Sequence, residues 1–415
     1  MLAVLCYQCI IGQDVTKIME EANEAYNGKD YENAVKYFTE AAEMGNAEAK
    51  YKLGVCYSLG QGVVPSYETA LEWIRKAAEQ GMEKAQYVLE AYNAKDGVYD
   101  TPSNLYDKAA NEGNAEAQFQ LGMRYARGKG LPQSFEKAAK WFQKAAEQGY
   151  ADAQYELGTY YANGNGVPQS YEIAAEWFYR AAEQGDPLSQ FQMGTCFSNG
   201  KGVPKSDTAA VFWYIKAAEQ GIKESQYNVG LIYYYGKGAP QSDEMAFNWF
   251  YMAAEQELIE AQYFIGLLYK QGRGTQQSYE SAENWFRKAA EQGDADAQRE
   301  LAILYYTGDG VQKSYYKAAE WFQKAAEQGN ARAQYCLGIC YLFGEGVQKS
   351  SYNAVLWFRK AAEQGDSDAL LKLGSCYYKG EGVPKSYNTA MDYFRKSAAL
   401  GNERAIEILK AFNEY

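Results

Sequence analysis

Residues 150–185 read YADAQYELGTYYANGNGVPQSYEIAAEWFYRAAEQG, and this stretch decides the fold because close copies of it recur along most of the chain. Its first half carries apolar residues at the spacing i, i+4, i+7 and i+8, which places them on one face of a helix. These residues are Ala153, Leu157, Tyr160 and Tyr161. The spacing predicts a first helix over residues 151–161.

The second half of the stretch predicts a loop and then a second helix. The glycines and the proline of residues 164–168 interrupt the helical pattern. Ser170 can cap the next helix because its hydroxyl accepts a hydrogen bond from a free backbone N–H. That helix is expected over residues 171–184, and Gly185 ends it because glycine tolerates left-handed backbone angles. Its inner side is predicted to carry Ala174, Trp177, Phe178 and Ala181.

The glycine that ends the second helix recurs at a fixed interval. It falls at Gly45, Gly81, Gly113, Gly149, Gly185, Gly221, Gly293, Gly329, Gly365 and Gly401, and Glu257 stands in its place once. Every interval is 36 residues except the 32 residues from Gly81 to Gly113. The sequence therefore predicts about ten copies of one helix pair, which overrides the two or three globular domains that 415 residues would suggest.

Tryptophan follows the same interval, eight residues before the closing position. The eight tryptophans are Trp73, Trp141, Trp177, Trp213, Trp249, Trp285, Trp321 and Trp357, and tyrosine takes the slot at Tyr37 and Tyr393. A row of aromatic rings can form a ligand cage, but one ring per unit favours structural core packing. Truncating a core indole is expected to cost about 3–5 kcal/mol.

Glycine also recurs inside the first helix and in the loop. The helical set is Gly54, Gly122, Gly158, Gly194, Gly230, Gly266, Gly338 and Gly374, with Ala302 as the variant. A glycine in mid-helix costs about 1 kcal/mol relative to alanine, so its repetition predicts close approach of two helices. The G-x-G of the loop lacks a preceding strand and a following Lys-Ser/Thr, which argues against a phosphate-binding loop.

The pattern A-x-A-Q-[YF]-x-L-G-x-x-Y-x-x-G-x-G-V-x-x-S-x-x-x-A-x-x-W-x-x-K-A-A-E-Q-G resembles the Sel1-like repeat family of the tetratricopeptide superfamily. The resemblance covers residues 46–401. It implies an all-α solenoid of antiparallel helix pairs in a right-handed superhelix, with the first helices on the concave side. It also implies a scaffold or adaptor in protein complexes, without catalysis. Some cysteine-rich members carry one disulfide per repeat, and that pairing is missing here.

Four segments organise the chain around this pattern. Residues 1–13 form an apolar N-terminal segment, and residues 14–45 resemble an ordinary tetratricopeptide helix pair. About ten repeats follow over residues 46–401, of which residues 82–113 lack the tryptophan and the G-x-G and are interpreted as degenerate, unless they set a bend or a specific contact. Residues 402–415 are predicted to form a helix that caps the apolar end of the last repeat.

Composition excludes several classes of function. The net charge is −12 without a basic block, which argues against nucleic acid and against an anionic membrane surface. Histidine, the commonest zinc ligand and general base, is absent from the sequence. We therefore expect no metal, no cofactor and no membrane insertion. The expected partner is a protein or peptide, neutral or basic, bound by a monomer.

The N-terminal segment and the cysteines bear on the compartment. The apolar opening MLAVLCYQCIIGQ has no basic residue before it, and it reads either as the end of a signal peptide or as a segment folded onto the first helix. Four cysteines, Cys56, Cys196, Cys340 and Cys376, share one repeat position, as expected for small apolar core residues. Free thiols favour the cytoplasm, whereas a signal peptide would imply an exported or periplasmic protein.

Function is expected at first-helix positions that the repeat does not fix. One such set is mostly polar: Lys52, Gln120, Glu156, Gln192, Asn228, Phe264, Glu300, Cys336 and Lys372. The other is apolar in the middle of the chain: Val55, Met123, Thr159, Thr195, Leu231, Leu267, Ile303, Ile339 and Ser375.

Aromatic residues are most frequent between residues 222 and 293, and bordering charge is typical of protein-binding surfaces. We therefore predict a partner-binding groove, with packing inside the repeats as the alternative. Its candidate residues are Tyr234, Tyr235, Tyr251, Phe264 and Leu267. A structural spacer in a larger complex is the alternative function. An enzyme is disfavoured because the carboxylate pairs recur in every unit, whereas a catalytic pair needs a distinctive environment.

Overall fold

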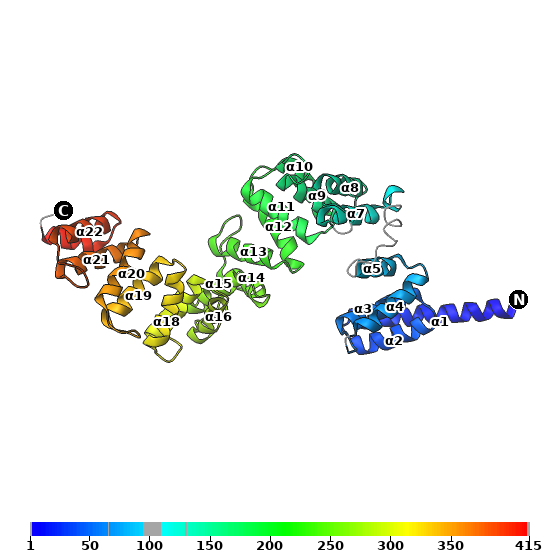
Figure 1. Cartoon of the computed structure of the whole chain (residues 1–415), viewed down its shortest axis with the longest axis horizontal. Coiled ribbons are helices and arrows are strands. Elements are labelled where there is room, and N and C mark those ends of the chain that lie inside the picture. The colour runs from blue at the N-terminus through cyan, green and yellow to red at the C-terminus, as the bar shows by residue number, and fades with distance from the viewer. Residues whose placement is uncertain (1, 65, 94–108, 129–130, 413–415) are drawn as a thin grey trace. The chain divides into compact units, whose positions relative to one another are not determined.

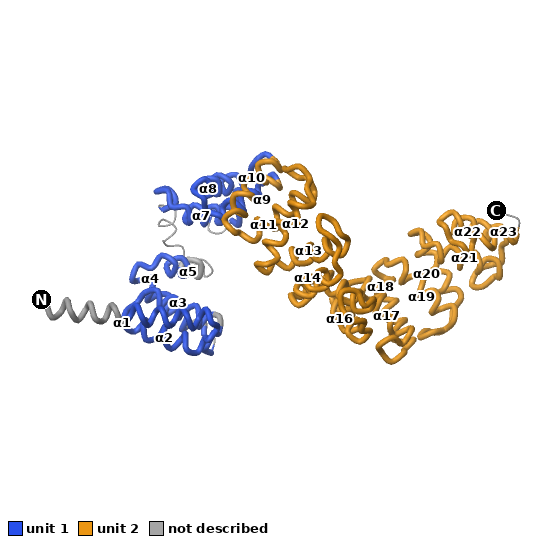
Figure 2. Tube along the Cα trace, turned by 180° about the vertical axis from the view of Figure 1, so that it is seen from behind, with its two compact units in different colours: residues 1–160, 164–168 blue, residues 161–163, 169–415 orange. Residues whose placement is uncertain are grey.

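The computed structural model describes residues 2–64, 66–93, 109–128 and 131–412, and all regular secondary structure in these ranges is helical (Figure 1). The predicted all-α class is therefore confirmed. The chain divides into two compact units, residues 1–160 with 164–168 and residues 161–163 with 169–415 (Figure 2). We call them unit 1 and unit 2 and describe each by itself.

Unit 1 contains the helices before the division. They are α1 (Leu2–Asn27), α2 (Tyr31–Glu43), α3 (Ala47–Leu59), α4 (Tyr67–Glu79), α5 (Glu83–Asn93), α7 (Ala115–Arg127), α8 (Phe135–Glu147) and most of α9 (Ala151–Asn163). Helix α1 continues through residue 13, where the sequence suggested a boundary. Of the shortened segment 82–113, residues 94–108 lie outside the described residues.

Unit 2 contains α10, which is the second helix of the pair that begins with α9, then six further helix pairs of the same pattern and one last helix. They are α10 (Tyr171–Glu183), α11 (Pro187–Asn199), α12 (Asp207–Glu219), α13 (Lys223–Tyr235), α14 (Asp243–Glu255), α15 (Ile259–Gln271), α16 (Tyr279–Glu291), α17 (Ala295–Thr307), α18 (Tyr315–Glu327), α19 (Ala331–Phe343), α20 (Ser351–Glu363), α21 (Ser367–Lys379), α22 (Tyr387–Ala399) and α23 (Glu403–Ala411). Each first helix packs on the second helix of its own pair and on the second helix before it. This packing of successive pairs is the predicted repeat solenoid.

Local capping explains where these helices begin and end. Ser170 Oγ accepts a hydrogen bond from the Ile173 N–H at 3.3 Å, as predicted for the start of α10. Gly164 follows α9 with left-handed angles, φ 72° and ψ 28°, so the helix reaches two residues beyond its predicted end. Gly185 also has positive φ, 96°, and turns the chain from α10 into the next repeat.

The interior of each pair is built around the residue that follows the tryptophan. Among the largest fully buried side chains, Phe142, Phe250, Phe286 and Phe358 lie at this position, and Phe38 lies at the equivalent position after Tyr37. Trp213 and Trp285 are buried, while the other six tryptophans are half-buried. The deepest aromatic ring of these pairs is therefore the phenylalanine, and most indoles lie at the rim of the core.

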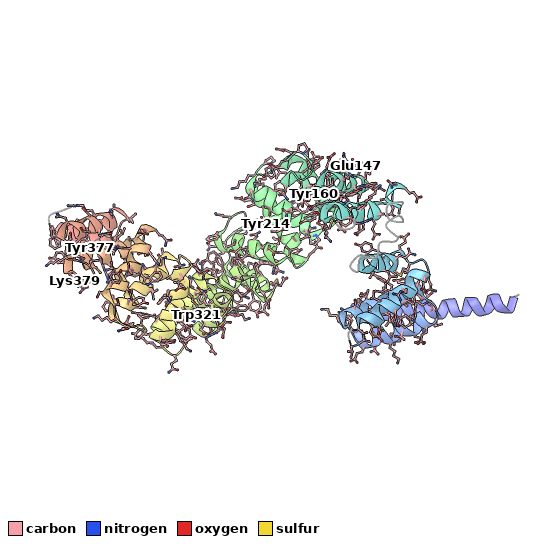
Figure 3. The ribbon with its side chains drawn as sticks, viewed as in Figure 1. Glu147, Tyr160, Tyr214, Trp321, Tyr377 and Lys379 are labelled. Atoms are coloured by element: carbon pink, nitrogen blue, oxygen red, sulfur yellow. The ribbon has the colours of Figure 1, made fainter. Side chains whose placement is uncertain are left out.

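A cation covers the outer face of most indoles. The charged residue three positions after the tryptophan, usually lysine, lies 3.9–4.9 Å from the ring centroid in seven of the eight repeats that contain a tryptophan. In Trp321, labelled in Figure 3, the Lys324 ammonium is 3.9 Å from the centroid. An indole can thus bury one face and offer the other to a cation, which explains why the KAAEQG motif keeps its lysine.

Glycine inside the first helix allows the close approach that the sequence predicted. A Cβ at Gly266 would lie 2.6 Å from the ring of Phe286, closer than side chains pack. The same contact joins Gly230 to Phe250 at 2.6 Å. The recurring spacing of glycine and phenylalanine therefore sets the distance between the two helices of these pairs.

A buried glutamine in the first helix links each repeat to the one before it. In seven repeats its Nε2 donates to the carbonyl of an alanine eight residues earlier, at 3.0–3.5 Å. The donors are Gln118, Gln154, Gln190, Gln226, Gln262, Gln298 and Gln334. Since each side chain is buried, these hydrogen bonds offset the cost of removing an amide from water.

The same glutamines also contact the glutamine of the K-A-A-E-Q-G motif at the end of the second helix. The glutamine of AAEQG donates Nε2 to the Oε1 of the first-helix glutamine of its own pair, at 2.7–2.9 Å in six pairs. Gln364, for example, donates to Gln334 and to the Gly329 carbonyl. In the last full repeat both positions are leucine, Leu370 and Leu400, so the two partners change together.

This pairing makes a prediction for the Gln334→Leu variant. The change removes the donor to the Ala326 carbonyl and the acceptor for Gln364, which should lower the free energy of unfolding by about 1–3 kcal/mol. Adding Gln364→Leu should cost less in this background than in the wild type, because its partner is already gone. Urea unfolding of the four proteins in this double-mutant cycle measures the coupling. Strictly additive losses would contradict the hydrogen-bonded link.

Candidate protein-binding surface

In unit 2, side chains at first-helix positions that vary between repeats contact each other in pairs. The ring of Tyr234 on α13 lies 5.5 Å from the ring of Phe264 on α15, edge to face. Lys270 Nζ on α15 lies 2.7 Å from Glu300 Oε2 on α17. Each residue of the second pair follows its counterpart in the first pair by 36 residues, so the repeat forms the same contact twice. We call the surface made by these four residues and Tyr235 the first-helix face.

The aromatic half of this face is a cluster of four rings, Tyr227, Tyr234, Tyr235 and Phe264, which we call the aromatic patch. Phe264 stacks on the buried Phe250 with centroids 4.8 Å apart. Tyr234 contacts Tyr235 at 4.9 Å. Tyr235 is 58 % exposed, whereas the other three rings are half-buried. The patch therefore has a packed base and one ring that projects into solvent.

Two cations border the aromatic patch. The Arg273 guanidinium lies 4.4 Å from the Tyr234 centroid and forms an ion pair with Asp243 at 2.6 Å. This ion pair holds the pKa of Asp243 below its usual range, mainly through the hydrogen bond from Arg273. Lys237 Nζ lies 5.9 Å from the Tyr235 centroid. The border is thus charged, but the charge of Arg273 is largely balanced.

Two of the five predicted binding residues lie elsewhere. Tyr251 is on α14, a second helix, where it stacks with Phe247 at 6.0 Å and contacts Trp285 at 5.8 Å. Leu267 is half-buried and packs against the core cluster that extends from α16 to α19. The structure therefore brings together Tyr234, Tyr235 and Phe264, but neither Tyr251 nor Leu267 belongs to the aromatic patch.

The ionic half of the first-helix face is centred on Glu300, which is 8 % exposed. Its carboxylate accepts hydrogen bonds from Lys270 and from Arg299 Nη2, each at 2.7 Å. Arg299 also pairs with Asp296 at 2.8 Å. Burial by itself would raise the pKa of Glu300, but the two cations lower it below the usual value. Glu300 is therefore a carboxylate held by its partners rather than a proton donor.

The five cysteines whose side chains the structure describes, Cys56, Cys196, Cys336, Cys340 and Cys376, are free thiols. Burial raises the pKa of Cys336 to about 11, and the reactive thiolate is therefore scarce at neutral pH. Among the described residues no group of three or more Cys, Asp or Glu side chains could hold a metal ion. Within those residues no helix has both the length and the apolar composition for a membrane crossing.

Sequence reasoning missed the contact between Lys270 and Glu300. The sequence places Glu300 in the mostly polar set of first-helix positions and indicates no partner for it. The signal was their separation of 30 residues, which the repeat fixes. Tyr234 and Phe264, which are also in contact, have the same separation. This separation predicts from the sequence that both the aromatic pair and the ionic pair are in contact, because they occupy equivalent positions of successive repeats.

Comparisons with known proteins agree with this architecture. The family model described as Sel1 repeat matches residues 28–46, 47–82, 115–150, 151–186, 187–222, 223–258, 259–294, 295–330, 331–366 and 367–402. No curated protein matches the chain.

Two solved structures are similar over most of their length. One is c5321, a protective antigen present in uropathogenic Escherichia coli strains with an SLR fold, which is 35% identical over 88% of this chain and 86% of that chain, with a TM-score of 0.58. The other is a Sel1 repeat protein from Oxalobacter formigenes, 34% identical over 77% of this chain and 92% of that chain, with a TM-score of 0.59. The repeats, the helix-pair fold and these matches together show that this chain belongs to the Sel1 repeat family.

Proposed function

We propose that this chain is a non-enzymatic scaffold that binds a protein or peptide partner on the first-helix face of unit 2. Sel1 repeat proteins are generally protein-interaction scaffolds. The observation that carries the proposal is Tyr235, which is 58 % exposed above a packed base formed by Tyr234 and Phe264. A rigid aromatic base with a projecting ring is typical of the centre of a protein interface.

The charges around the aromatic patch favour a neutral partner segment at this point. Arg273 is paired with Asp243 and Lys270 with Glu300, and Lys237, the other cation that borders the patch, is exposed to solvent. An apolar or aromatic side chain of the partner can therefore pack against Tyr235 without leaving an unpaired ion buried. Elsewhere the net charge of −12 favours neutral or basic partners at long range. We expect these contacts on the concave side that the first helices of such repeats line.

Replacing Tyr235 with alanine tests the proposal directly. The side chain is largely exposed, so the fold should keep its helicity and stability. Binding of a partner purified with the wild-type protein should weaken at least about tenfold, the effect of losing an aromatic hot spot. The dissociation constant is measured by isothermal titration calorimetry.

A matched control comes from Tyr316, which is 70 % exposed on the second helix α18. Tyr316→Ala should leave the dissociation constant unchanged. Equal affinity of Tyr235→Ala and wild type would contradict the proposed surface. Failure of every purified associate to bind saturably would instead favour a structural spacer.

A further inference from the structure

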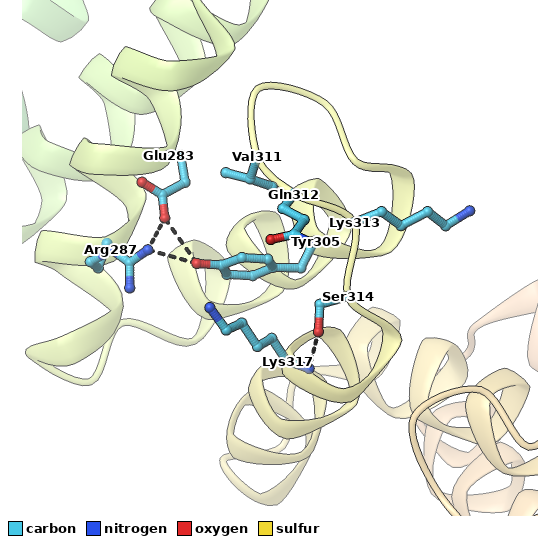
Figure 4. Close-up of a pocket in the computed structure, with 8 residues that line it drawn as sticks. All are labelled: Glu283, Arg287, Tyr305, Val311, Gln312, Lys313, Ser314 and Lys317. Carbon is cyan, nitrogen blue, oxygen red and sulfur yellow. Dashed lines mark hydrogen bonds and ion pairs between the residues drawn. The ribbon is translucent and has the colours of Figure 1, made fainter.

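A second irregular site lies in unit 2 on the second helix α16, away from the aromatic patch. It is a pocket of about 450 Å³ between α16, the end of α17 and the loop that leads into α18 (Figure 4). Glu283, Arg287, Tyr305, Val311, Gln312, Lys313, Ser314 and Lys317 line it. Figure 4 shows that Glu283, Arg287 and Lys317 extend toward the hydroxyl end of Tyr305, whereas Lys313 extends away.

Glu283 is the residue that sets this repeat apart. It is 6 % exposed, and the equivalent residues of the other α8-to-α22 second helices are apolar: Ala139, Ala175, Val211, Phe247, Ala319, Val355 and Met391. A buried carboxylate is costly unless hydrogen bonds and opposite charge satisfy it. Placing such a group in one repeat alone indicates a role that the fold itself does not require.

Glu283 and Tyr305 together fix the position of Arg287. Arg287 Nη2 donates to Glu283 Oε1 and to the Tyr305 hydroxyl, the latter at 2.6 Å. Tyr305 in turn donates to the same carboxylate oxygen at 3.1 Å. Among the described residues, no group accepts a hydrogen bond from Nε or Nη1 of Arg287. These two donors remain for a ligand, in an orientation that is already set.

Lys317 supplies a second cation on the same side. Its ammonium lies 5.1 Å from the Tyr305 ring centroid. No carboxylate in the described part of the chain lies within ion-pair distance of it. A chain with net charge −12 thus gathers two cations, Arg287 and Lys317, around one carboxylate that is already hydrogen-bonded.

We propose that this pocket binds the carboxylate of a peptide, between Arg287 and Lys317 and against the ring of Tyr305. A planar carboxylate matches the fork of a guanidinium, and its single charge matches the single cation left unneutralised. Val311, which is half-buried, provides an apolar contact for the short stem that carries the group, and Tyr305, only 4 % exposed, lies at the base of the pocket. The ligand is an acidic side chain or a peptide C-terminus, which share this chemistry.

The chain contains its own control for this site. Arg359 and Tyr377 stand 72 residues after Arg287 and Tyr305, and Arg359 donates to the Tyr377 hydroxyl at 2.7 Å. Val355 replaces the buried carboxylate, and Thr389 replaces the lysine. Arg359 therefore reports how an arginine in the same fold behaves without Glu283 and Lys317.

The test follows the Nε–Hε resonances of the full chain labelled with ¹⁵N-arginine. The signal of Arg287 is assigned by its loss in Arg287→Gln, and that of Arg359 by its loss in Arg359→Gln. Two probes at constant ionic strength separate the sources, acetyl-Ala-Glu-Ala-amide for a side chain and acetyl-Ala-Ala-Ala with a free C-terminus. We expect a saturable shift of Arg287 with at least one peptide at a Kd of about 1 mM, and no saturable shift of Arg359.

Lys317→Gln should weaken this binding at least about fivefold because it removes the second cation. Lys313→Gln, which changes a lysine that extends away from the site, should not. A linear shift common to both arginines, or binding unchanged in Lys317→Gln, would overturn the proposal. Tighter binding of inorganic phosphate than of either peptide would overturn the carboxylate assignment.

Discussion

Phe358→Ala is expected to lower the free energy of unfolding by about 3–5 kcal/mol, the cost of truncating a fully buried aromatic side chain. Phe358 is 0% exposed and packs against Tyr335 and against the glycine of its own pair, Gly338. The nearest helices cannot close the resulting cavity without giving up their other contacts. Denaturant unfolding measures the loss, with hydrogen exchange of α19–α22 showing where it occurs, because a repeat array can unfold in parts.

The neighbouring Trp357 is the matched control for this prediction. It is half-buried, and Lys360 lies 4.1 Å from its ring centroid on the open side. Trp357→Ala should therefore cost clearly less than Phe358→Ala, about 2 kcal/mol. An equal or larger loss for Trp357→Ala would show that the indole, and not the phenylalanine, is the main interior residue of the pair.

Gly346→Ala is expected to cost about 3–5 kcal/mol, for two separate reasons. Gly346 has φ +75°, and a residue with a Cβ pays about 1–2 kcal/mol in this region. A Cβ would also overlap the Tyr315 carbonyl at the start of the preceding second helix, α18, so the loop would have to move away. That movement would strain the hydrogen bond from Tyr306 to Glu345, 2.6 Å long, which joins the loop to α17.

Gly365 separates the two contributions. Its φ is +86°, but a Cβ there would meet no atom within 4 Å. Gly365→Ala should therefore cost only the backbone part, about 1–2 kcal/mol. Urea unfolding of both variants gives the difference between them. If the two substitutions cost the same, the loop would not be held against the preceding repeat in the way the structure describes.

Much of the fold was predictable because every copy of the repeat contains the same helix-capping and turn residues. The closing glycines, the serine caps and the G-x-G loops each have a local physical cause, and Ser170 and Gly185 behave as predicted. The division of labour between Trp and Phe was less predictable, since both lie on the inner half of the second helix. Which of two adjacent rings is deeper depends on the angle at which the next pair packs.

The candidate site was predictable only in part, for a related reason. Tyr234 and Phe264 meet because the repeat places residues 30 apart on neighbouring first helices. Tyr251 has the same aromatic character, but it belongs to a second helix and contacts Trp285 instead. The pocket at Glu283 forms where the loop of the following repeat packs against α16. No local pattern in the sequence predicts that contact.

We propose that the regular residues hold the repeats together while the irregular first-helix residues of unit 2 bind the partner. A photoreactive phenylalanine analogue placed at position 235, and separately at position 316, tests it in the cells that produce the protein. Both positions are well exposed, so chance collisions should label them equally. We expect one discrete cross-linked partner at position 235 and none at position 316. The same partner cross-linked at both positions, or at position 316 alone, would contradict it.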